Sequence, residues 1–237
     1  VSFNLEVPMP RYTFAILPLM VLLLSQHDPV SQNSIEGALD SDLQKTCMWN
    51  MVRAGNNKDT LKKNLQRMNV LISDNEEDYC MWKGVTCLNH RVEKIEWTAI
   101  SFLIVDIDWA PNSITYIQTD KVRLWTDELI TQRLPRVVRY CRFQYCDLSG
   151  TPDLTALPIN LEVLDVGWNR LTGTLNLTRL NDNIRSIHFN GNPIKRIIVD
   201  NKNLPNSLEH IGFTSERWKI SVTSFNDEKV DRRIVIF

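Results

Sequence analysis

Hydrophobic residues recur in a fixed pattern along residues 92–218. The pattern places apolar side chains at offsets 0, 3, 5 and 10 of a unit of 22–24 residues, and six copies succeed one another. The copies begin at Val92, Ile114, Val138, Leu161, Ile184 and Leu208. Of the 24 template positions 23 are apolar, with Thr119 the exception, whereas composition alone predicts about 10. The pattern indicates tandem structural repeats.

Each copy predicts a short strand. Offsets 3 and 5 lie on one side of an extended segment, so each copy sends two apolar groups inward and the intervening positions outward. One strand cannot bury its own face, whereas parallel copies stacked on one another form each other's core. Proline, which is typical just ahead of a strand, stands three residues before four copies, at Pro111, Pro135, Pro158 and Pro205.

A turn is predicted after each strand, with backbone groups that face inward. Asn169 and Asn192 at offset 8, and more weakly the Cys146 thiol, are expected to satisfy those groups by hydrogen bonds. The other copies have Ile100, Val122 and Glu216 at this offset, so we expect their turns to be less regular.

Two segments resemble a known family. Residues 161–173, Leu-Glu-Val-Leu-Asp-Val-Gly-Trp-Asn-Arg-Leu-Thr-Gly, resemble the leucine-rich-repeat consensus of plant receptor ectodomains, with an echo of the ending at residues 148–150. Residues 80–87 are similar to the Cys-x-Trp-x-Gly-Val-x-Cys cap of plant-type repeat ectodomains and of protozoan repeat surface antigens. The resemblance implies an α/β fold: a leucine-rich-repeat solenoid with a concave parallel β-sheet, a mostly irregular convex side and a helical N-terminal cap. It also implies a disulfide between Cys80 and Cys87.

The flanking segments complete the predicted organisation. Apolar residues at helical spacing predict two amphipathic cap helices that shield the first strand, one with Ile35, Leu39 and Leu43, the other with Leu61, Leu65, Met68, Leu71 and Ile72. We expect residues 230–237 to form a strand that folds back on residues 221–225, unless the gene is cut short. The predicted parts are a leader (1–30), the cap (31–90), about six repeats (91–220) and a C-terminal strand or cap (221–237).

The N-terminal segment predicts where the protein resides. After Arg11 come thirteen residues without charge, 12–24, too few for a membrane span of about 20 but suited to a signal peptide that begins at Met9. The alternatives are an uncleaved anchor or a buried segment. We therefore expect a secreted or cell-surface protein, in which Cys80 and Cys87 are oxidised. If the segment is no signal, both are reduced thiols.

Composition and the remaining motifs exclude several classes of function. The formal charge is −1, so no overall field draws the chain to nucleic acid or to an anionic membrane. We expect no catalytic site, cofactor or metal, because catalytic motifs are absent and the four histidines, at 27, 90, 188 and 210, are scattered. Asp106 and Asp108 are interpreted as solvated loop charges, and Cys141 and Cys146 as small buried core residues.

The outward side of the sheet is the predicted binding face. Aromatic residues and arginine are typical interface anchors because they bury much area and keep a polar end. The candidate contact residues are Tyr116, Tyr140, Arg142, Gln144, Asp165, Trp168 and His188. The alternative is a solvated sheet in which Arg142 pairs with Asp165. We expect Arg142→Glu with Tyr140→Ala to leave thermal stability nearly unchanged but to abolish ligand capture.

The sequence thus predicts a secreted or surface-exposed module that binds a protein or glycan partner. Alternatives are a receptor-type ectodomain or a soluble enzyme inhibitor. Membrane contact is expected only if the N-terminal run is an uncleaved anchor. Asn176, in Asn-Leu-Thr, is a candidate glycosylation site beyond the strand of the fourth copy.

Overall fold

The computed structural model describes residues 29–52, 58–71, 78–100, 102–214, 219–225 and 229–236. The predicted signal segment, residues 12–24, lies outside them. The chain divides into two compact units, residues 1–43 and 44–237, and each is considered by itself. Among the described helices, none combines the length and hydropathy that a membrane span requires.

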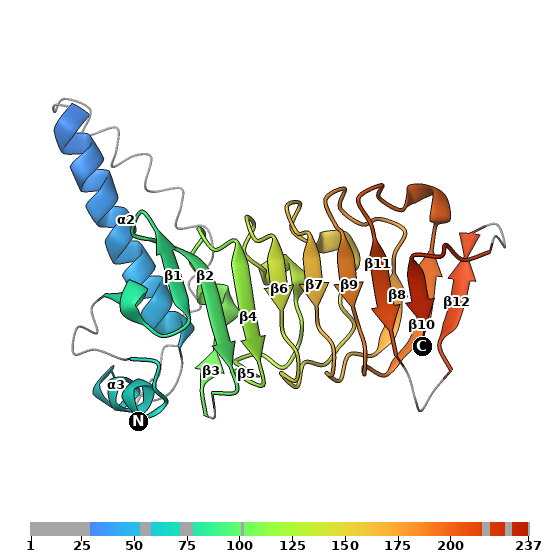
Figure 1. Ribbon diagram of the computed structural model, residues 1–237, viewed down its shortest axis with the longest axis horizontal. Helices are drawn as coiled ribbons and strands as arrows, with labels where there is room; N and C mark the ends of the chain where they lie inside the picture. Colours follow the sequence, from blue (N-terminus) through green and yellow to red (C-terminus); the bar gives the residue numbers. More distant parts are fainter. Residues whose placement is uncertain are drawn as a thin grey trace, which may run out of the picture. The chain divides into compact units, whose positions relative to one another are not determined.

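Residues 44–237 form a parallel-strand β-solenoid of about six turns. Its main sheet has eight strands, which lie side by side along the molecule (Figure 1). In order they are β1 (Val85–Leu88), β2 (Arg91–Thr98), β4 (Tyr116–Asp120), β6 (Tyr140–Arg142), β7 (Val163–Asp165), β9 (Ser186–His188), β11 (His210–Phe213) and β13 (Ile234–Ile236). Strand β1 runs antiparallel to β2, and every later pair is parallel.

The predicted register of the strands is confirmed. Residues at offset 4 of successive copies stand opposite one another, in the order Glu96, Gln118, Arg142, Asp165, His188 and Gly212. The inward residues at offset 3 are fully buried: Ile95, Ile117, Cys141, Leu164, Ile187 and Ile211. Thr119, the polar exception, also occupies a fully buried position. Equivalent residues of successive copies therefore stack into a continuous core.

One template position is wrong in the first copy. Phe102, predicted to be in the core at offset 10, is 89% exposed with φ of +68°, and Leu103 is buried instead. The turn after β2 thus holds one more residue than the template allows, which moves the inward position along by one. Trp218, the corresponding residue of the last copy, lies outside the described residues.

The side opposite the main sheet is more regular than predicted. It carries a parallel sheet in the order β12-β10-β8 and the pair β3-β5. The strands are β3 (Ile104–Val105), β5 (Arg123–Leu124), β8 (Gly173–Asn176), β10 (Ile194–Val199) and β12 (Ser221–Ser224). Between them lie the single-turn 3-10 helices η3 (Ile107–Trp109), η4 (Thr131–Arg133), η5 (Leu154–Ala156) and η6 (Asn201–Asn203).

Asparagine side chains hold the turns together from inside, as the sequence predicted. The buried Asn169 accepts hydrogen bonds from the backbone N–H groups of Cys146 (2.9 Å) and Leu148 (3.1 Å), and its amide donates to three carbonyl oxygens. Asn192 accepts from Leu171 N (3.0 Å) and donates to Val166 O (2.9 Å). The buried Cys146 thiol donates to Thr119 O (2.7 Å). Each of these side chains thus joins its own turn to the preceding one.

The two predicted helices are present, as α2 (Pro29–Met51) and α3 (Lys58–Arg67), but the second ends before the predicted Met68 and Leu71, and Ile72 lies outside the described residues. The predicted apolar face of the first is wrong at Leu43, which is 43% exposed, whereas Met48 and Met51 are fully buried. In α3, Leu65 is fully buried as predicted.

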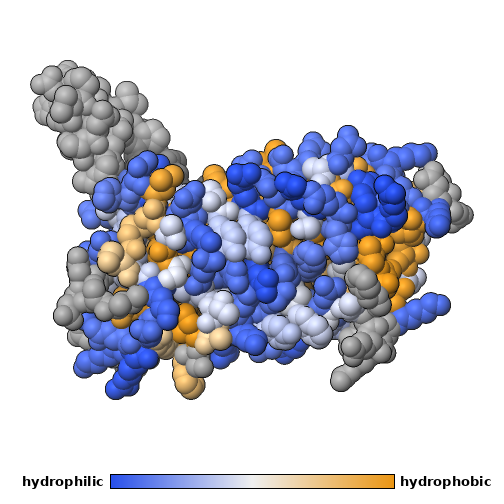
Figure 2. Space-filling view, in the orientation of Figure 1, coloured by the Kyte–Doolittle hydropathy of each residue, from blue (hydrophilic) through white to orange (hydrophobic). Residues whose placement is uncertain are grey.

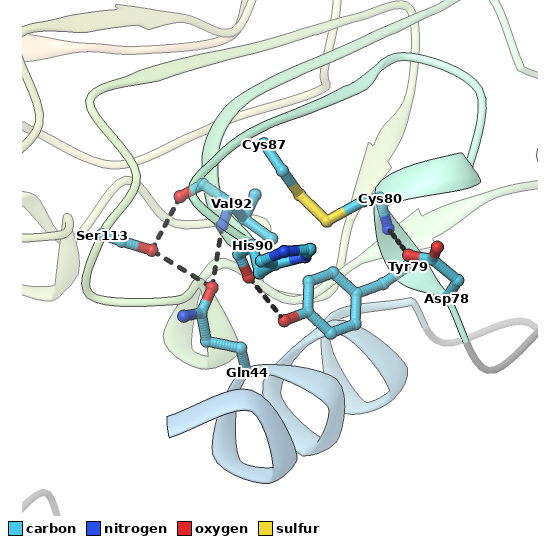
Figure 3. Close-up of a disulfide and its surroundings, with 8 residues drawn as sticks. All are labelled: Gln44, Asp78, Tyr79, Cys80, Cys87, His90, Val92 and Ser113. Carbon is cyan, nitrogen blue, oxygen red and sulfur yellow. Dashed lines mark hydrogen bonds between the residues drawn. A yellow bond between two sulfur atoms is a disulfide. The ribbon is translucent and has the colours of Figure 1, made fainter. Parts of the chain in front are cut away.

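A disulfide joins Cys80 and Cys87 ahead of the second strand, which confirms the predicted pair (Figure 3). It connects η2 (Tyr79–Met81) to β1. Tyr79 donates from its hydroxyl to His90 O (2.9 Å), and the Gln44 side chain accepts from Val92 N (2.8 Å), as Figure 3 shows. Val92 begins the first repeat. Its backbone N–H is therefore satisfied by a side chain of α2 and not by a preceding repeat.

The C-terminal segment is placed differently from the prediction. Strand β13 pairs in parallel with β11, whereas β12, at residues 221–224, pairs with β10 on the opposite side. Of the predicted segment, the described residues 230–236 therefore do not fold back on residues 221–225. Ile234 and Ile211 stand opposite each other in the register of the main sheet, so β13 adds one more parallel strand to it.

We predict that Asn169→Ala lowers the free energy of unfolding by about 2–4 kcal/mol, because it leaves buried N–H and C=O groups without partners. Urea denaturation followed by circular dichroism measures the change. Asn206→Ala, at an exposed asparagine, is the matched control and should change stability by less than about 0.5 kcal/mol. Equal effects of the two substitutions would contradict the role assigned to Asn169.

Candidate functional site

The candidate site is the sheet face, which we define as the side chains at offsets 2, 4 and 6 of each copy, on the outward side of the main sheet. At its centre Arg142 lies between two buried carboxylates. Its Nε is 2.8 Å from Asp120 Oδ2, and its Nη1 is 3.8 Å from Asp165 Oδ2. Asp120 and Asp165 are only 6% and 7% exposed. Both the predicted pairing with Asp165 and a closer pairing with Asp120 are therefore present.

Amide side chains extend this group into a connected network. Gln144 accepts from Arg142 Nη2 (2.9 Å) and donates from Nε2 to Asp165 Oδ2 (2.7 Å). On the other side, Gln118 donates to Asp120 Oδ2 (2.7 Å). Burial lowers the pKa of Arg142, but the charges of Asp120 and Asp165 and the hydrogen bonds around the guanidinium outweigh it, so the net pKa is raised. The guanidinium is thus fixed in position as a cation.

An aromatic pair borders the network. The rings of Tyr116 and Tyr140 are parallel, with centroids 4.3 Å apart, and the Tyr116 hydroxyl donates to Gln118 Oε1 (2.8 Å). Lys94 Nζ lies 4.4 Å from the Tyr116 ring centroid, within the range of a cation–π contact. Burial, with the neighbouring Tyr140, raises the pKa of Tyr116 to about 12. Both rings are half-buried and held by their neighbours.

His188 stands opposite Asp165 on the neighbouring strand, β9. Its ring centroid is 5.4 Å from that of His210, on β11. Burial lowers the pKa of His188 and outweighs the opposing effect of the Asp165 carboxylate, while His210 adds to the lowering. The neutral imidazole is therefore favoured at this position.

Trp168 lies beyond the strand, at offset 7, in a row of residues whose backbone has the left-handed conformation. Ala99, Lys121, Tyr145, Trp168 and Gly191 occupy this offset in successive copies, with φ between +54° and +72°. Each donates its backbone N–H to a carbonyl of the next copy. The exposed rings of Trp168 and Tyr145 are parallel, with centroids 5.7 Å apart, and Lys121 Nζ lies 5.5 Å from the Tyr145 centroid.

The structure therefore brings together most of the predicted contact residues. Five of them form the Tyr116-to-Asp165 network, His188 borders it, and Trp168 lies apart on the turn. Asp165 is nearly covered, so it braces the network and offers little area to a partner. The repeat offsets place Asp120, Asn190 and His210 on this face, but none of them was among the predicted contact residues, and Tyr145 was missed. The equal offsets of Tyr145 and Trp168 were the available signal, since equal offsets place side chains in one row.

Residues outside the face take structural roles. The interpretation of Asp106 as a solvated charge is wrong: it is 4% exposed and accepts from Asp108 N (3.1 Å), while Asp108 pairs with Arg133 (3.2 Å). Cys141 and Cys146 are buried free thiols, as predicted, and burial raises the pKa of both, that of Cys146 to about 11.

The candidate glycosylation residue Asn176 is exposed at the end of β8. Its Oδ1 accepts from the backbone N–H (3.0 Å) and the hydroxyl (2.7 Å) of Thr178. Asp153 and Asp200 make the same backbone contact two residues on, in other copies. Asn176 thus also serves as a turn residue, with its side chain on the side opposite the sheet face.

Hydrophilic side chains cover most of the repeat region in the view of Figure 2, and hydrophobic surface gathers toward its C-terminal end. Exposed Ile236 of β13 belongs to that end. Within the described part of the chain, no three side chains of the His, Cys, Asp or Glu type are grouped so as to hold a metal ion. The sheet face is mainly polar, and its aromatic side chains stack on those of neighbouring copies.

Comparison with models of known protein families and with curated proteins returned no match to this chain.

We predict that Arg142→Leu lowers the free energy of unfolding by about 2 kcal/mol, because it leaves Asp120 and Asp165 buried without their cation. The loss is smaller than for a fully buried ion pair because the guanidinium is partly exposed to solvent. Urea denaturation measures the loss. Arg139→Leu, at an exposed arginine paired with Glu162, is the control and should cost less than about 1 kcal/mol.

This expectation replaces the sequence-based one for Arg142→Glu with Tyr140→Ala, which should destabilise the protein because it places a third carboxylate in the network. A melting temperature equal to that of the wild type would contradict the bracing role of Arg142.

Proposed function

We propose that this chain is a leucine-rich-repeat solenoid with a helical N-terminal cap, secreted or exposed at the cell surface, that binds a protein or glycan partner on its sheet face. The observation that carries the proposal is the connected network from Tyr116 to Asp165, which presents fixed aromatic, cationic and amide groups on one surface.

The repeat type is supported by three features. The unit length of 22–24 residues and the consensus-like segment 161–173 resemble this family. The buried asparagines Asn169 and Asn192 bond the turns from within. The disulfide of Cys80 and Cys87 lies immediately before the first repeat, where an open core end requires cover.

Support for the helical cap comes from the contacts of residues 44–92. Met48, Met51 and Trp82 are buried in the same hydrophobic core as Val92 and Ile95. The Trp49 and Trp82 rings meet edge to face, with centroids 5.0 Å apart. Gln44 satisfies the backbone donor of Val92. These contacts are those expected of a cap that closes the first strand of a solenoid.

Support for an extracytoplasmic location comes from cysteine chemistry and from Asn176. Disulfides persist mainly in oxidising compartments. Asn176 is exposed within a glycosylation motif. Neither feature involves the sheet face, so both are compatible with a face that stays open to a partner.

Fixed side chains favour binding because little conformational entropy remains to be lost. Ordering one mobile side chain at an interface costs about 0.5–1.5 kcal/mol. Arg142 is held by two carboxylates and an amide, and Tyr116 and Tyr140 hold each other. A partner that meets this face therefore encounters anchors that are already ordered, of the residue types that dominate interface energetics.

Intact-mass analysis of the protein secreted from eukaryotic cells tests the location. We expect the mass to fall on deglycosylation and to rise by two hydrogen atoms on reduction of Cys80–Cys87. Asn176→Gln should abolish the first change, and Asn183→Gln is the matched control at an asparagine outside a glycosylation motif. Protein retained in the cell with all thiols free would contradict the proposed location.

Binding is tested by probing arrays of extracellular proteins and glycans with the wild type and two tryptophan variants. Trp168 and Trp125 are similarly exposed, at 48% and 54%, but Trp125 comes directly after β5, away from the main sheet. For a partner captured by the wild type, we expect Tyr140→Ala to weaken binding at least tenfold, about 1.4 kcal/mol, and Trp168→Ala to weaken it more than Trp125→Ala. Binding that survives Tyr140→Ala and is lost in Trp125→Ala would place the site elsewhere.

A further inference from the structure

Three polar atoms converge over a glycine near the end of the sheet face. A Cβ atom built on Gly212 would lie 2.7 Å from His210 Nε2, 3.5 Å from His188 Nδ1 and 3.5 Å from Asn190 Oδ1. His188 stands opposite Gly212 on the neighbouring strand, and His210 precedes Gly212 by two residues on β11. All four residues belong to the sheet face. The missing side chain of Gly212 thus leaves a small space lined by two imidazoles and one amide oxygen.

The amide oxygen in this group has no hydrogen-bond partner. Among the buried side-chain nitrogen and oxygen atoms of the described residues, Asn190 Oδ1 is the one without a partner. A buried acceptor left unsatisfied costs about 1–3 kcal/mol, and such an atom in a folded protein indicates a bound ion, a bound water or a functional role. It lies beside two imidazole nitrogens, and an electron pair on each of the three atoms can be shared with one cation.

We propose that His188, His210 and Asn190 bind a divalent transition-metal ion over Gly212. Imidazole nitrogens select ions such as Zn²⁺, Cu²⁺ and Ni²⁺, whereas Mg²⁺ and Ca²⁺ prefer oxygen ligands. Metal–ligand bonds are about 2.0–2.2 Å long, so the three side chains rotate to bring their ligand atoms to that distance from the ion. Three protein ligands leave a coordination position open on the outer side.

Nothing in the sequence alone indicated this site, because His188 and His210 are 22 residues apart and match no metal-ligand spacing. The repeat supplies the missing link. His188 lies at offset 4 of the fifth copy and His210 at offset 2 of the sixth, and these two copies begin 24 residues apart. The two imidazoles therefore lie diagonally across neighbouring strands, because His188 stands opposite Gly212 and not opposite His210. Their ring centroids are 5.4 Å apart and the planes are inclined by 41°.

The environment of the histidines suits ligation. Metal ligands must be unprotonated, and burial lowers the pKa of His188 and so favours its neutral form. The Asp165 carboxylate and the Arg142 guanidinium both act on His188, and their charges oppose each other there. The site requires only residues of β9, β11 and the turn after β9, so metal binding can be tested without a partner, although His188 is also one of the predicted contact residues.

Isothermal titration calorimetry of the full chain with Zn²⁺, repeated with Mg²⁺, tests the site. We expect one Zn²⁺ per chain and no binding of Mg²⁺. His210→Gln and Gly212→Ala should each weaken Zn²⁺ binding at least tenfold, the second because its Cβ fills the space without removing a ligand. Gly212 has no left-handed φ, so alanine is tolerated by the backbone. His90→Gln, at an exposed histidine in a turn, is the matched control and should bind as the wild type does.

A second measurement separates ligation from a structural role. Asn190→Ala removes an unsatisfied oxygen, so the metal-free protein should melt at the same or a higher temperature, while the rise in melting temperature caused by Zn²⁺ shrinks or disappears. The proposal is overturned if the wild type shows no saturable binding. It is also overturned if His188→Gln with His210→Gln binds Zn²⁺ unchanged, which would place the ion elsewhere, for example at the Cys47 thiol.

Discussion

The hydrogen bonds of the buried turns are the interaction on which the rest of the structure depends. A solenoid turn carries backbone donors and acceptors into an interior without water, and each must find a partner there. Asn169 meets five such groups, and Asn192 does the same kind of bonding one copy later. Because every one of these bonds reaches the preceding or the same turn, they fix the register between copies. The register then decides which side chains lie side by side.

That register builds the sheet face from residues that are distant in the chain. Asp120, Arg142 and Asp165 belong to three successive copies, so more than 20 residues of sequence separate each charged residue of the network from the next. The same rule places Tyr116 on Tyr140 and Tyr145 beside Trp168. A surface assembled in this way is rigid, because its side chains are held by the stack and not by loops.

Periodicity made the strands predictable, whereas features that depend on side-chain detail were mostly missed. The offsets identified the strands, their alignment and the inward asparagines, because burial leaves a regular apolar signal. The position of Leu103 in place of Phe102 could not be predicted, since one added turn residue breaks the template locally. The pairing of strand β13 was predicted wrongly, because an apolar segment alone does not indicate which sheet edge it joins.

The candidate site was predictable in location but not in its internal bonding. The column of offset 4 placed Arg142 between neighbours, yet the closer partner, Asp120, lies at offset 6 and reaches across a diagonal. Diagonal contacts depend on side-chain length and rotamer, which the pattern does not encode. The convergence of His188, His210 and Asn190 over Gly212 has the same origin, because it arises from the absence of a side chain.

The row of left-handed residues after each strand has a consequence for how this surface can change. The backbone shape there is set by the turn, and alanine, lysine, tyrosine, tryptophan and glycine all adopt it. For a residue other than glycine this conformation carries strain of about 1–2 kcal/mol. The turns therefore accept side chains of different size and chemistry at one outward position, at a modest loss of stability. Such a row is a natural place for specificity to diverge while the scaffold stays the same.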